Sequence, residues 1–244
     1  MERIAVLADI HGVLPALEAV LAEPDVRSAD VVVLAGDLAA GPQPVETLDL
    51  LLGLGGRAVW VRGNAERELV SMARGEQLDP PDPVSPWAAA QLRPDQVELL
   101  ATLPTSVTIG STLFCHATPR DDEEMVLVDS PISRWTEVFT GLSDDVRTVV
   151  CGHTHMPFAR QVDRRLVVNA GSVGMPYGAP LPSWALLTGS DVQLRRTALD
   201  IEAMADRVVA ESTYPDRAAF ADEYLRSNYS DTEVLAAFRP RAEG

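Results

Sequence analysis

The sequence contains no lysine, and it has few histidine, cysteine and aromatic residues. All 20 basic residues are arginine, against 36 acidic residues, and the formal net charge is −16. This charge argues against DNA, RNA or an anionic membrane as a partner held by bulk electrostatics. It is compatible with a small phosphorylated substrate, because bound cations would reverse the sign of the local charge.

Two further absences narrow the class of protein. No apolar run approaches the roughly 18 residues that a membrane span needs, and the first apolar stretch stops at Asp9 without a small-residue cleavage site. Cys115 and Cys151 do not suggest a disulfide framework, and both are more typical of small buried residues than of metal ligands. We therefore expect a cytoplasmic protein whose N-terminal stretch forms the first strand.

The first part of the chain alternates between apolar runs and helical patterns. With 244 residues, of which 46% are hydrophobic, the chain can form a domain with a large core. The alternation favours βαβ units and a parallel sheet. The expected strands there cover residues 3–8, 31–35 and 58–61, and the expected helices cover residues 14–22, 44–54 and 65–74, with one or two more helices over residues 85–103.

The pattern changes after residue 104 to strands with short connections. The segment TSVTIGSTLFCHA predicts a hairpin that turns at Gly110 and Ser111. The other expected strands cover residues 148–151, 158–162, 166–169, 183–187 and 192–196, with one helix over residues 132–142. The sequence DPPDP at residues 79–83 predicts a rigid linker or the approach to a lid.

The chain past Asp200 has a helical pattern. We expect a single α/β domain over residues 1–244, with a core over about residues 1–197 and a helical tail over about residues 200–240. Three roles are open for this tail: it could pack on the sheet, form a contact between subunits of a homo-oligomer, or cover a pocket.

Polar residues follow five of the expected strands at the points where these strands end. This is where open α/β sheets bind ligands. Glycine precedes Asp37, Asn64 and His153, which permits a sharp exit with positive φ and a close approach of the backbone to a ligand. The complete set of polar residues is Asp9, His11, Asp37, Asn64, His116, His153 and His155.

All four histidines of the chain belong to this set. A lone histidine at a strand end is most simply a satisfied or partly exposed residue, but four of four, with Asp and Asn beside them, favour a metal site. Nitrogen and oxygen donors without thiolate suit Mn, Fe or Zn. In the D-x-H and H-x-H segments, alternate side chains point the same way if the chain stays extended, so two donors can reach one small volume.

The order D-x-H, G-D, G-N, H and G-H-x-H resembles the calcineurin-like metallophosphoesterase superfamily over about residues 1–197. The segment NAGSVG at residues 169–174 is similar to the turn after the last ligand in small bacterial and archaeal phosphodiesterase-like members. The resemblance implies a four-layer αββα sandwich of two mixed sheets flanked by helices, and two metal ions bridged by Asp37. One ion would be held by Asp9, His11, Asp37 and His155, and the other by Asp37, Asn64, His116 and His153.

The same resemblance implies a dinuclear metal-dependent phosphoesterase in which a metal-bridging hydroxide attacks phosphorus. Asp37, Asn64 and His116 would be catalytic, Mn would be the metal favoured for activity, and the substrate would be a small phosphorylated compound. Asn64 and Arg120 are candidates for substrate binding, although Arg120 could equally be a solvated side chain paired with Asp121 or Glu123. Arg62 is a weaker candidate.

The sequence departs from the family pattern at Ala65. Many members have G-N-H-[DE], where the histidine assists the leaving group, whereas residues 63–66 here are GNAE. Because a general acid contributes about 10²–10⁴-fold, its absence favours phosphodiesters, or esters whose leaving group needs little protonation. It makes a protein phosphatase or a symmetrical diadenosine tetraphosphatase a weaker expectation. The alternatives are a metal-binding scaffold or regulatory protein without turnover, and a phosphomonoesterase or nucleotide phosphatase.

Two acidic segments near these motifs have simpler interpretations. Glu66 is most simply a charge near a helix N-terminus. The run DDEE at residues 121–124 is most simply a solvated loop, although it could shape access to the site.

Overall fold

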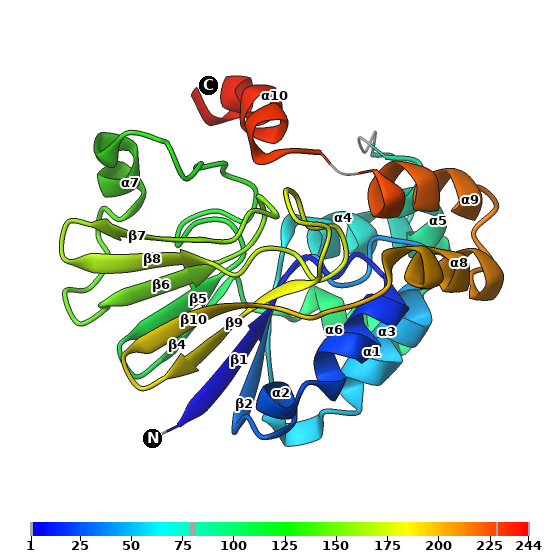
Figure 1. Ribbon diagram of the computed structural model, residues 1–244, viewed down its shortest axis with the longest axis horizontal. Helices are drawn as coiled ribbons and strands as arrows, with labels where there is room; N and C mark the ends of the chain where they lie inside the picture. The colour runs from blue at the N-terminus through cyan, green and yellow to red at the C-terminus, as the bar shows by residue number, and fades with distance from the viewer. Residues whose placement is uncertain (1, 79–81, 228, 244) are drawn as a thin grey trace.

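Two five-stranded sheets form the centre of the computed structural model, which describes residues 2–78, 82–227 and 229–243 (Figure 1). The first sheet contains β1 (Arg3–Leu7), β2 (Val31–Ala35), β3 (Ala58–Val61), β9 (Ser183–Thr188) and β10 (Asp191–Arg196). The second contains β4 (Ser106–Ile109), β5 (Thr112–Cys115), β6 (Thr148–Cys151), β7 (Phe158–Val162) and β8 (Arg165–Asn169).

Both sheets are mixed. The strand orders are β10-β9-β1-β2-β3 and β4-β5-β6-β8-β7. Parallel pairing joins β1, β2 and β3 in the first sheet and β5, β6 and β8 in the second, and the remaining pairs are antiparallel. The parallel strands end at the same edge of their sheet, which is where the polar residues of the predicted site follow them.

Aliphatic side chains fill the space between the sheets. Strand β2 shows why its sequence is apolar throughout: Val33 and Ala35 face the second sheet, whereas Val32 and Leu34 face the helices on the other side. Phe114 of β5 is fully buried in the same layer between the sheets. The two sheets are therefore held face to face by a continuous apolar layer.

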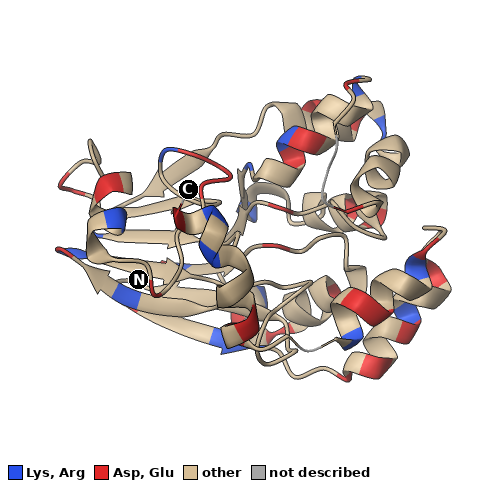
Figure 2. Cartoon of the chain, turned by 90° about the horizontal axis from the view of Figure 1, so that it is seen from above, with Lys and Arg blue, Asp and Glu red and all other residues tan. Residues whose placement is uncertain are grey.

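Helices cover the outer face of the first sheet. They are α1 (Leu14–Ala22), α2 (Pro24–Arg27), α3 (Pro44–Leu52), the 3₁₀ helix η1 (Gly55–Arg57), α4 (Asn64–Ala73), α5 (Val84–Gln91), α6 (Pro94–Ala101), α8 (Ile201–Glu211), α9 (Arg217–Phe220) and the π-helical segment η2 (Ala221–Arg226). Acidic residues are spread over these helices and over the loops (Figure 2).

The outer face of the second sheet has a thinner cover, provided by α7 (Ile132–Val138), whose Trp135 and Val138 pack on Val149 and Phe158. The result is a four-layer αββα sandwich, as expected from the sequence. The last helix, α10 (Asp231–Glu243), belongs to neither layer and lies apart from α8 and α9 (Figure 1). No helix in the described ranges is long and apolar enough to cross a membrane.

The predicted strands agree with the structure to within one residue, but several helices differ. Residues 85–103, where one or two helices were expected, form two, because Pro94 cannot continue a helix and instead begins α6. Helix α7 ends at Val138 rather than at Leu142. Gly141 lies beyond this end and has a left-handed backbone, with a φ of +82°. The short helix α2 was not predicted, and the expected linker at residues 79–83 falls largely on residues 79–81, outside the described residues.

Candidate metal centre

The polar residues after the strands meet at the ends of both sheets. Asp9 and His11 follow β1, Asp37 follows β2, His116 follows β5, and His153 and His155 follow β6. They form two clusters, and within each cluster the candidate ligand atoms lie within 4.8 Å of one another. One cluster contains Asp9, His11 and His155, and the other contains Asp37, His116 and His153.

Asp37 lies between the two clusters. Its Oδ1 atom is 3.3 Å from Nε2 of His116, and its Oδ2 atom is 3.8 Å from Nε2 of His11. Asp9 is placed similarly for its own cluster, with Oδ1 3.3 Å from Nε2 of His155. The two oxygens of Asp37 therefore face different clusters, as a bridging carboxylate requires.

Each histidine uses one ring nitrogen for a hydrogen bond to a main-chain carbonyl. In His11, His116 and His155 this atom is Nδ1, at 3.2, 2.8 and 2.8 Å from the carbonyl oxygen. In His153 it is Nε2, at 3.0 Å from the carbonyl oxygen of Glu123. These bonds fix the ring orientation and the tautomer. The other nitrogen of each ring is the one available to a metal, and in His11 and His155 these Nε2 atoms face each other at 3.1 Å.

The backbone of the donors is left-handed rather than extended. Positive φ angles occur at Asp9 (53°), His11 (50°), Asp37 (55°), His153 (68°) and His155 (57°). Among the other non-glycine residues that the structure describes, only Asp163 shares this conformation. Such conformations persist when the surroundings enforce them, and they concentrate at functional sites.

The assumption of an extended chain in the D-x-H and H-x-H segments was therefore wrong. The backbone coils at each donor, and the two histidines of H-x-H separate: His153 joins Asp37, and His155 joins Asp9. One short segment can thus contribute to both clusters.

The three glycines before donors act in two ways. Gly36 has a φ of +88°, as expected for a sharp exit from β2. Gly63 and Gly152 have ordinary φ angles, but a Cβ atom would lie 2.3 Å from Oδ1 of Asp37 at Gly63 and 2.4 Å from Oδ2 of Asp9 at Gly152. The predicted positive φ is thus confirmed at Gly36, and close approach explains the other two.

Two buried polar atoms of this centre have no hydrogen-bond partner among the described residues. They are Oδ1 of Asn64 and Nε2 of His116. Buried polar atoms are normally paired, so two orphaned ones beside the clusters need an explanation. Divalent cations would satisfy both, and the nitrogen and oxygen donors match the preferences of Mn, Fe and Zn. The residues fit a dinuclear metal centre.

The charges of the centre are strongly coupled. Burial alone would raise the pKa of Asp37, but the charge of the nearby His116 holds this pKa below its usual range. Burial opposes protonation of His116, yet Asp37 raises its pKa. Burial and the neighbouring His116 lower the pKa of His153 to about 4, so His153 is neutral at neutral pH.

Glu66 is a buried part of this centre, not merely a charge at the helix N-terminus. Its Oε2 atom accepts hydrogen bonds from the main-chain N–H groups of Asp37 and Gly63, both at 2.8 Å, and Oε1 accepts one from Leu38 at 2.7 Å. Burial and the charge of Asp37 raise its pKa, whereas the N–H donors favour the carboxylate. Glu66 joins the loop after β2 to the loop after β3.

The acidic run at residues 121–124 is more than a solvated loop. Asp122 is buried and forms ion pairs with Arg62 and Arg67. The carbonyl of Glu123 orients His153. The run therefore helps to position one donor.

The guanidinium of Arg120 pairs with Glu124 and Glu137. These partners differ from the two that the sequence suggested. Arg120 is not among the residues that line the cavity over the clusters.

The turn at residues 169–174 supports the opposite side of the centre. Asn169 donates hydrogen bonds to the carbonyl of Gly152 at 2.5 Å and to the hydroxyl of Thr154 at 3.0 Å, and both residues belong to the segment that carries His153 and His155. Ser172 donates to the carbonyl oxygen of Asp9 at 2.6 Å. These contacts hold the coiled backbone of the donors in place.

A sequence model described as the calcineurin-like phosphoesterase superfamily domain matches residues 2–191. The chain belongs to this superfamily. An uncharacterized protein of Methanocaldococcus jannaschii, MJ0912, is 24% identical over 84% of this chain and 91% of its own length. Phosphodiesterase YfcE of Escherichia coli K12 is 26% identical over 77% of this chain and 88% of its own length.

A solved structure shares the fold. The crystal structure of a metallophosphoesterase from Sphaerobacter thermophilus superposes with a TM-score of 0.73, at 24% identity, over 91% of this chain and 98% of that chain.

A cavity of about 520 Å³ lies over the two clusters. Asn64, Ala65 and four of the metal-site residues form one side of it. The residues that sequence reasoning missed form the rest, and they include Glu68, Tyr177, Phe220, Tyr224, Phe238 and Arg241. No motif marks them, because they come from α4, from the loop between β8 and β9, and from the C-terminal helices.

The division of H-x-H between the clusters predicts the metal content of variants. We expect two Mn²⁺ per wild-type chain and one in His153→Ala or His155→Ala, because each change removes a ligand from one cluster only. The combination His153→Ala/His155→Ala should bind none. The matched control is His11→Ala/His155→Ala, which removes two ligands from a single cluster and should keep one ion. Metal analysis after dialysis measures this, and equal losses in both double variants would contradict the assignment.

The contacts of Glu66 predict a second result. In Glu66→Gln the amide NH₂ must face a main-chain N–H group, so the free energy of unfolding should fall by about 1–3 kcal/mol. Affinity for Mn²⁺ should fall about 10–100-fold, because Glu66 orients Asp37. Urea denaturation and calorimetric titration measure the two effects. Glu98→Gln is the control, since the Glu98 side chain is 70% exposed; the same loss of affinity there would refute the role of Glu66.

Proposed function

We propose that this protein is a dinuclear metal-dependent phosphoesterase that prefers phosphodiesters. The observation that carries the proposal is the position of Asp37, whose two carboxylate oxygens face two separate His/Asp clusters. Two bound divalent ions would supply Lewis acidity and a hydroxide nucleophile at neutral pH. Family membership and the similarity to a protein named as a phosphodiesterase support the same reaction class.

The protein residues have distinct roles in this proposal. Asp9, His11 and His155 hold one ion, and His116, His153 and Asn64 hold the other, with Asp37 shared. The amide of Asn64 is oriented by Glu68, to which its Nδ2 atom donates at 3.5 Å. This leaves the buried Oδ1 of Asn64, which has no hydrogen-bond partner among the described residues, available as a metal ligand. Asn64 also lines the cavity, so the second N–H of its amide is the group that would donate to a phosphate oxygen and stabilise the charge that develops there.

The preference for diesters rests on Ala65. Its side chain lines the cavity beside Asn64, and its main-chain N–H donates to Oδ1 of Asp37 at 2.9 Å. A methyl group at this position can neither donate a proton nor stabilise an oxyanion. Leaving groups that need little protonation are therefore favoured.

The state of the site favours turnover over a scaffold role. Six of the seven expected donors form the two clusters, each histidine has one ring nitrogen that is not bonded to the main chain, and a cavity opens over the clusters. A protein that only bound metal for stability would need no such space beside the ions. A phosphomonoesterase would use the same centre, and a panel of mono-, di- and cyclic phosphates separates the two activities.

Removal of the shared ligand tests the proposal. We expect Asp37→Ala to lower Mn²⁺-dependent hydrolysis of bis(p-nitrophenyl) phosphate by more than about 10²-fold, because neither ion keeps its full set of ligands. Asp163→Ala is a matched control: Asp163 has the same left-handed backbone, with a φ of 52°, in the turn between β7 and β8. Its activity should be unchanged. Undiminished turnover by Asp37→Ala after removal of metal would overturn the proposal.

A gain of function tests the role of Ala65. In Ala65→His an imidazole would reach the cavity beside Asn64 and could protonate a leaving group. We expect hydrolysis of methyl phenyl phosphate to rise by about 10²-fold or more, with little change for methyl p-nitrophenyl phosphate, whose leaving group needs no proton. Ala65→Gln adds similar volume without an acid and should give no gain. An equal gain for both substrates, or for both variants, would contradict this explanation of the diester preference.

A further inference from the structure

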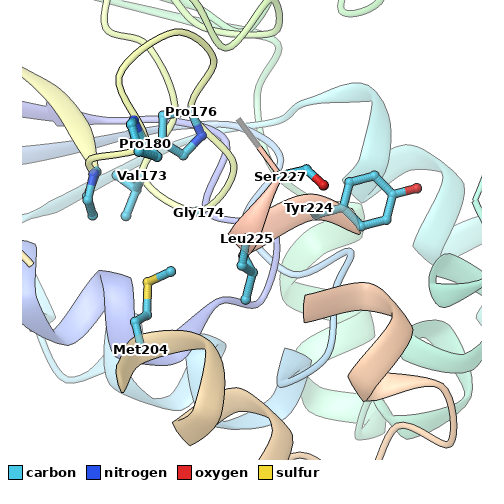
Figure 3. Close-up of a pocket in the computed structure, with 9 residues that line it drawn as sticks. Val173, Gly174, Pro176, Pro180, Met204, Tyr224, Leu225 and Ser227 are labelled. Carbon is cyan, nitrogen blue, oxygen red and sulfur yellow. The ribbon is translucent and has the colours of Figure 1, made fainter. Parts of the chain in front are cut away.

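The first half of the C-terminal tail packs on the helical layer of the first sheet. In α8, Met204, Ala205 and Val208 are buried against this layer. Leu225 of η2 is also buried there and lies beside Met204 at a small pocket of about 10 Å³, too small for any organic ligand (Figure 3). The side chain of Tyr224, the preceding residue, points in another direction (Figure 3). Tyr224 also lines the cavity over the metal centre.

Helix α10 packs on the loops around the metal centre instead. Val234 and Ala242 are buried against Met125, Leu127 and Met156, apart from the main core. Arg239 adds an ion pair with Asp129 at 2.6 Å. This anchoring places Phe238 and Arg241 at the cavity. Of the three roles open for the tail, covering the pocket is the one that α10 fulfils in this structure.

Aromatic rings from three segments line this cavity. The ring of Tyr177 stacks on the ring of His155, with centroids 5.4 Å apart and an interplanar angle of 23°. Phe238 of α10 meets Tyr177 edge to face at 5.9 Å. Phe220 and Tyr224 form a second pair, with centroids 5.0 Å apart. His155, Tyr177 and Phe238 thus form a row of contacting rings that begins at a candidate metal ligand.

The charges in the cavity disfavour a second phosphate. Three carboxylates, those of Glu68, Asp82 and Glu123, line it beyond the metal ligands. Arg241 is the only arginine among the described residues that line the cavity, and the chain has no lysine. Carboxylates would repel the additional phosphates of a polyphosphate or a nucleic-acid strand. A neutral planar ring would instead find aromatic partners.

We propose, building on the phosphoesterase function above, that Tyr177, Phe220, Tyr224 and Phe238 form a subsite for a planar ring of the substrate. The substrate class is a compact diester with a single phosphate, at least one of whose ester groups carries an aromatic or heteroaromatic ring. Helix α10 provides the outer wall of this subsite. Stacking of one ring on aromatic side chains is worth about tenfold in affinity or more.

Two phosphonates that cannot be hydrolysed test the subsite without turnover. Phenylphosphonate and methylphosphonate share the group that binds metals and differ in the ring. Calorimetric titration of the Mn²⁺-loaded protein should show phenylphosphonate binding about tenfold more tightly. In Phe238→Ala this ratio should fall toward one, while affinity for methylphosphonate and the metal content stay unchanged. Phe238→Trp should restore the preference for the ring.

Leu235→Ala is the matched control for the packing of α10. Leu235 lies in the same apolar cluster as Phe238 but does not line the cavity. An unchanged ratio in Leu235→Ala, with loss in Phe238→Ala, supports the ring contact. An equal loss in both variants, or equal binding of the two phosphonates by the wild-type protein, overturns the subsite.

The titrations measure binding and the panel of phosphate esters measures hydrolysis, so together they separate this proposal from the proposed function. Binding that prefers the ring, without hydrolysis of any ester, would leave the subsite standing and refute the esterase. Hydrolysis of diesters without preference for the ring would do the reverse.

Discussion

The arrangement of the metal centre depends on the buried carboxylate of Glu66. It accepts hydrogen bonds from three main-chain N–H groups in the loops after β2 and β3. These bonds orient Asp37, whose oxygens then face both clusters. A buried carboxylate is costly unless its oxygens are satisfied, and the three donors meet that cost locally. Bound metal ions would stabilise the neighbouring carboxylates of Glu66 and Asp37 together. The folded arrangement of the loops and the binding of metal would then depend on each other.

The fold supplies the second requirement, which is convergence. Parallel strands in each sheet end at one edge, and the apolar layer between the sheets aligns these edges. Donors from five strand ends then meet without any long loop. The left-handed backbone at five of these donors turns the chain sharply as each strand ends, and hydrogen bonds from Asn169 and Ser172 hold those turns. The strain is thus supported by the rigid elements on both sides.

Much of this could be predicted from the sequence. Apolar runs such as residues 31–35 define the strands, and the grouping of all four histidines at strand ends indicates a metal centre. The bridging position of Asp37 and the division of H-x-H came from the family resemblance, and the geometry agrees with both. The burial of Glu66 could not be predicted from its charge, although its place three residues into α4 is a known position for bonds to main-chain N–H groups. The cavity wall had no signal at all, because Tyr177 and Phe238 are brought together only by tertiary packing.

The position of α10 has an evolutionary consequence. The superfamily model matches residues 2–191, which include every metal donor, whereas the aromatic wall formed by Phe220, Tyr224 and Phe238 lies beyond that range. Under the two proposals, the metal donors are therefore encoded in one stretch of the gene and three of the four rings of the subsite in another, whereas Tyr177 lies in the same stretch as the donors. Mutations in the later stretch can alter which molecules enter the cavity while the reactive centre stays intact. Substitutions in α9, η2 or α10 would change this wall without touching a metal donor.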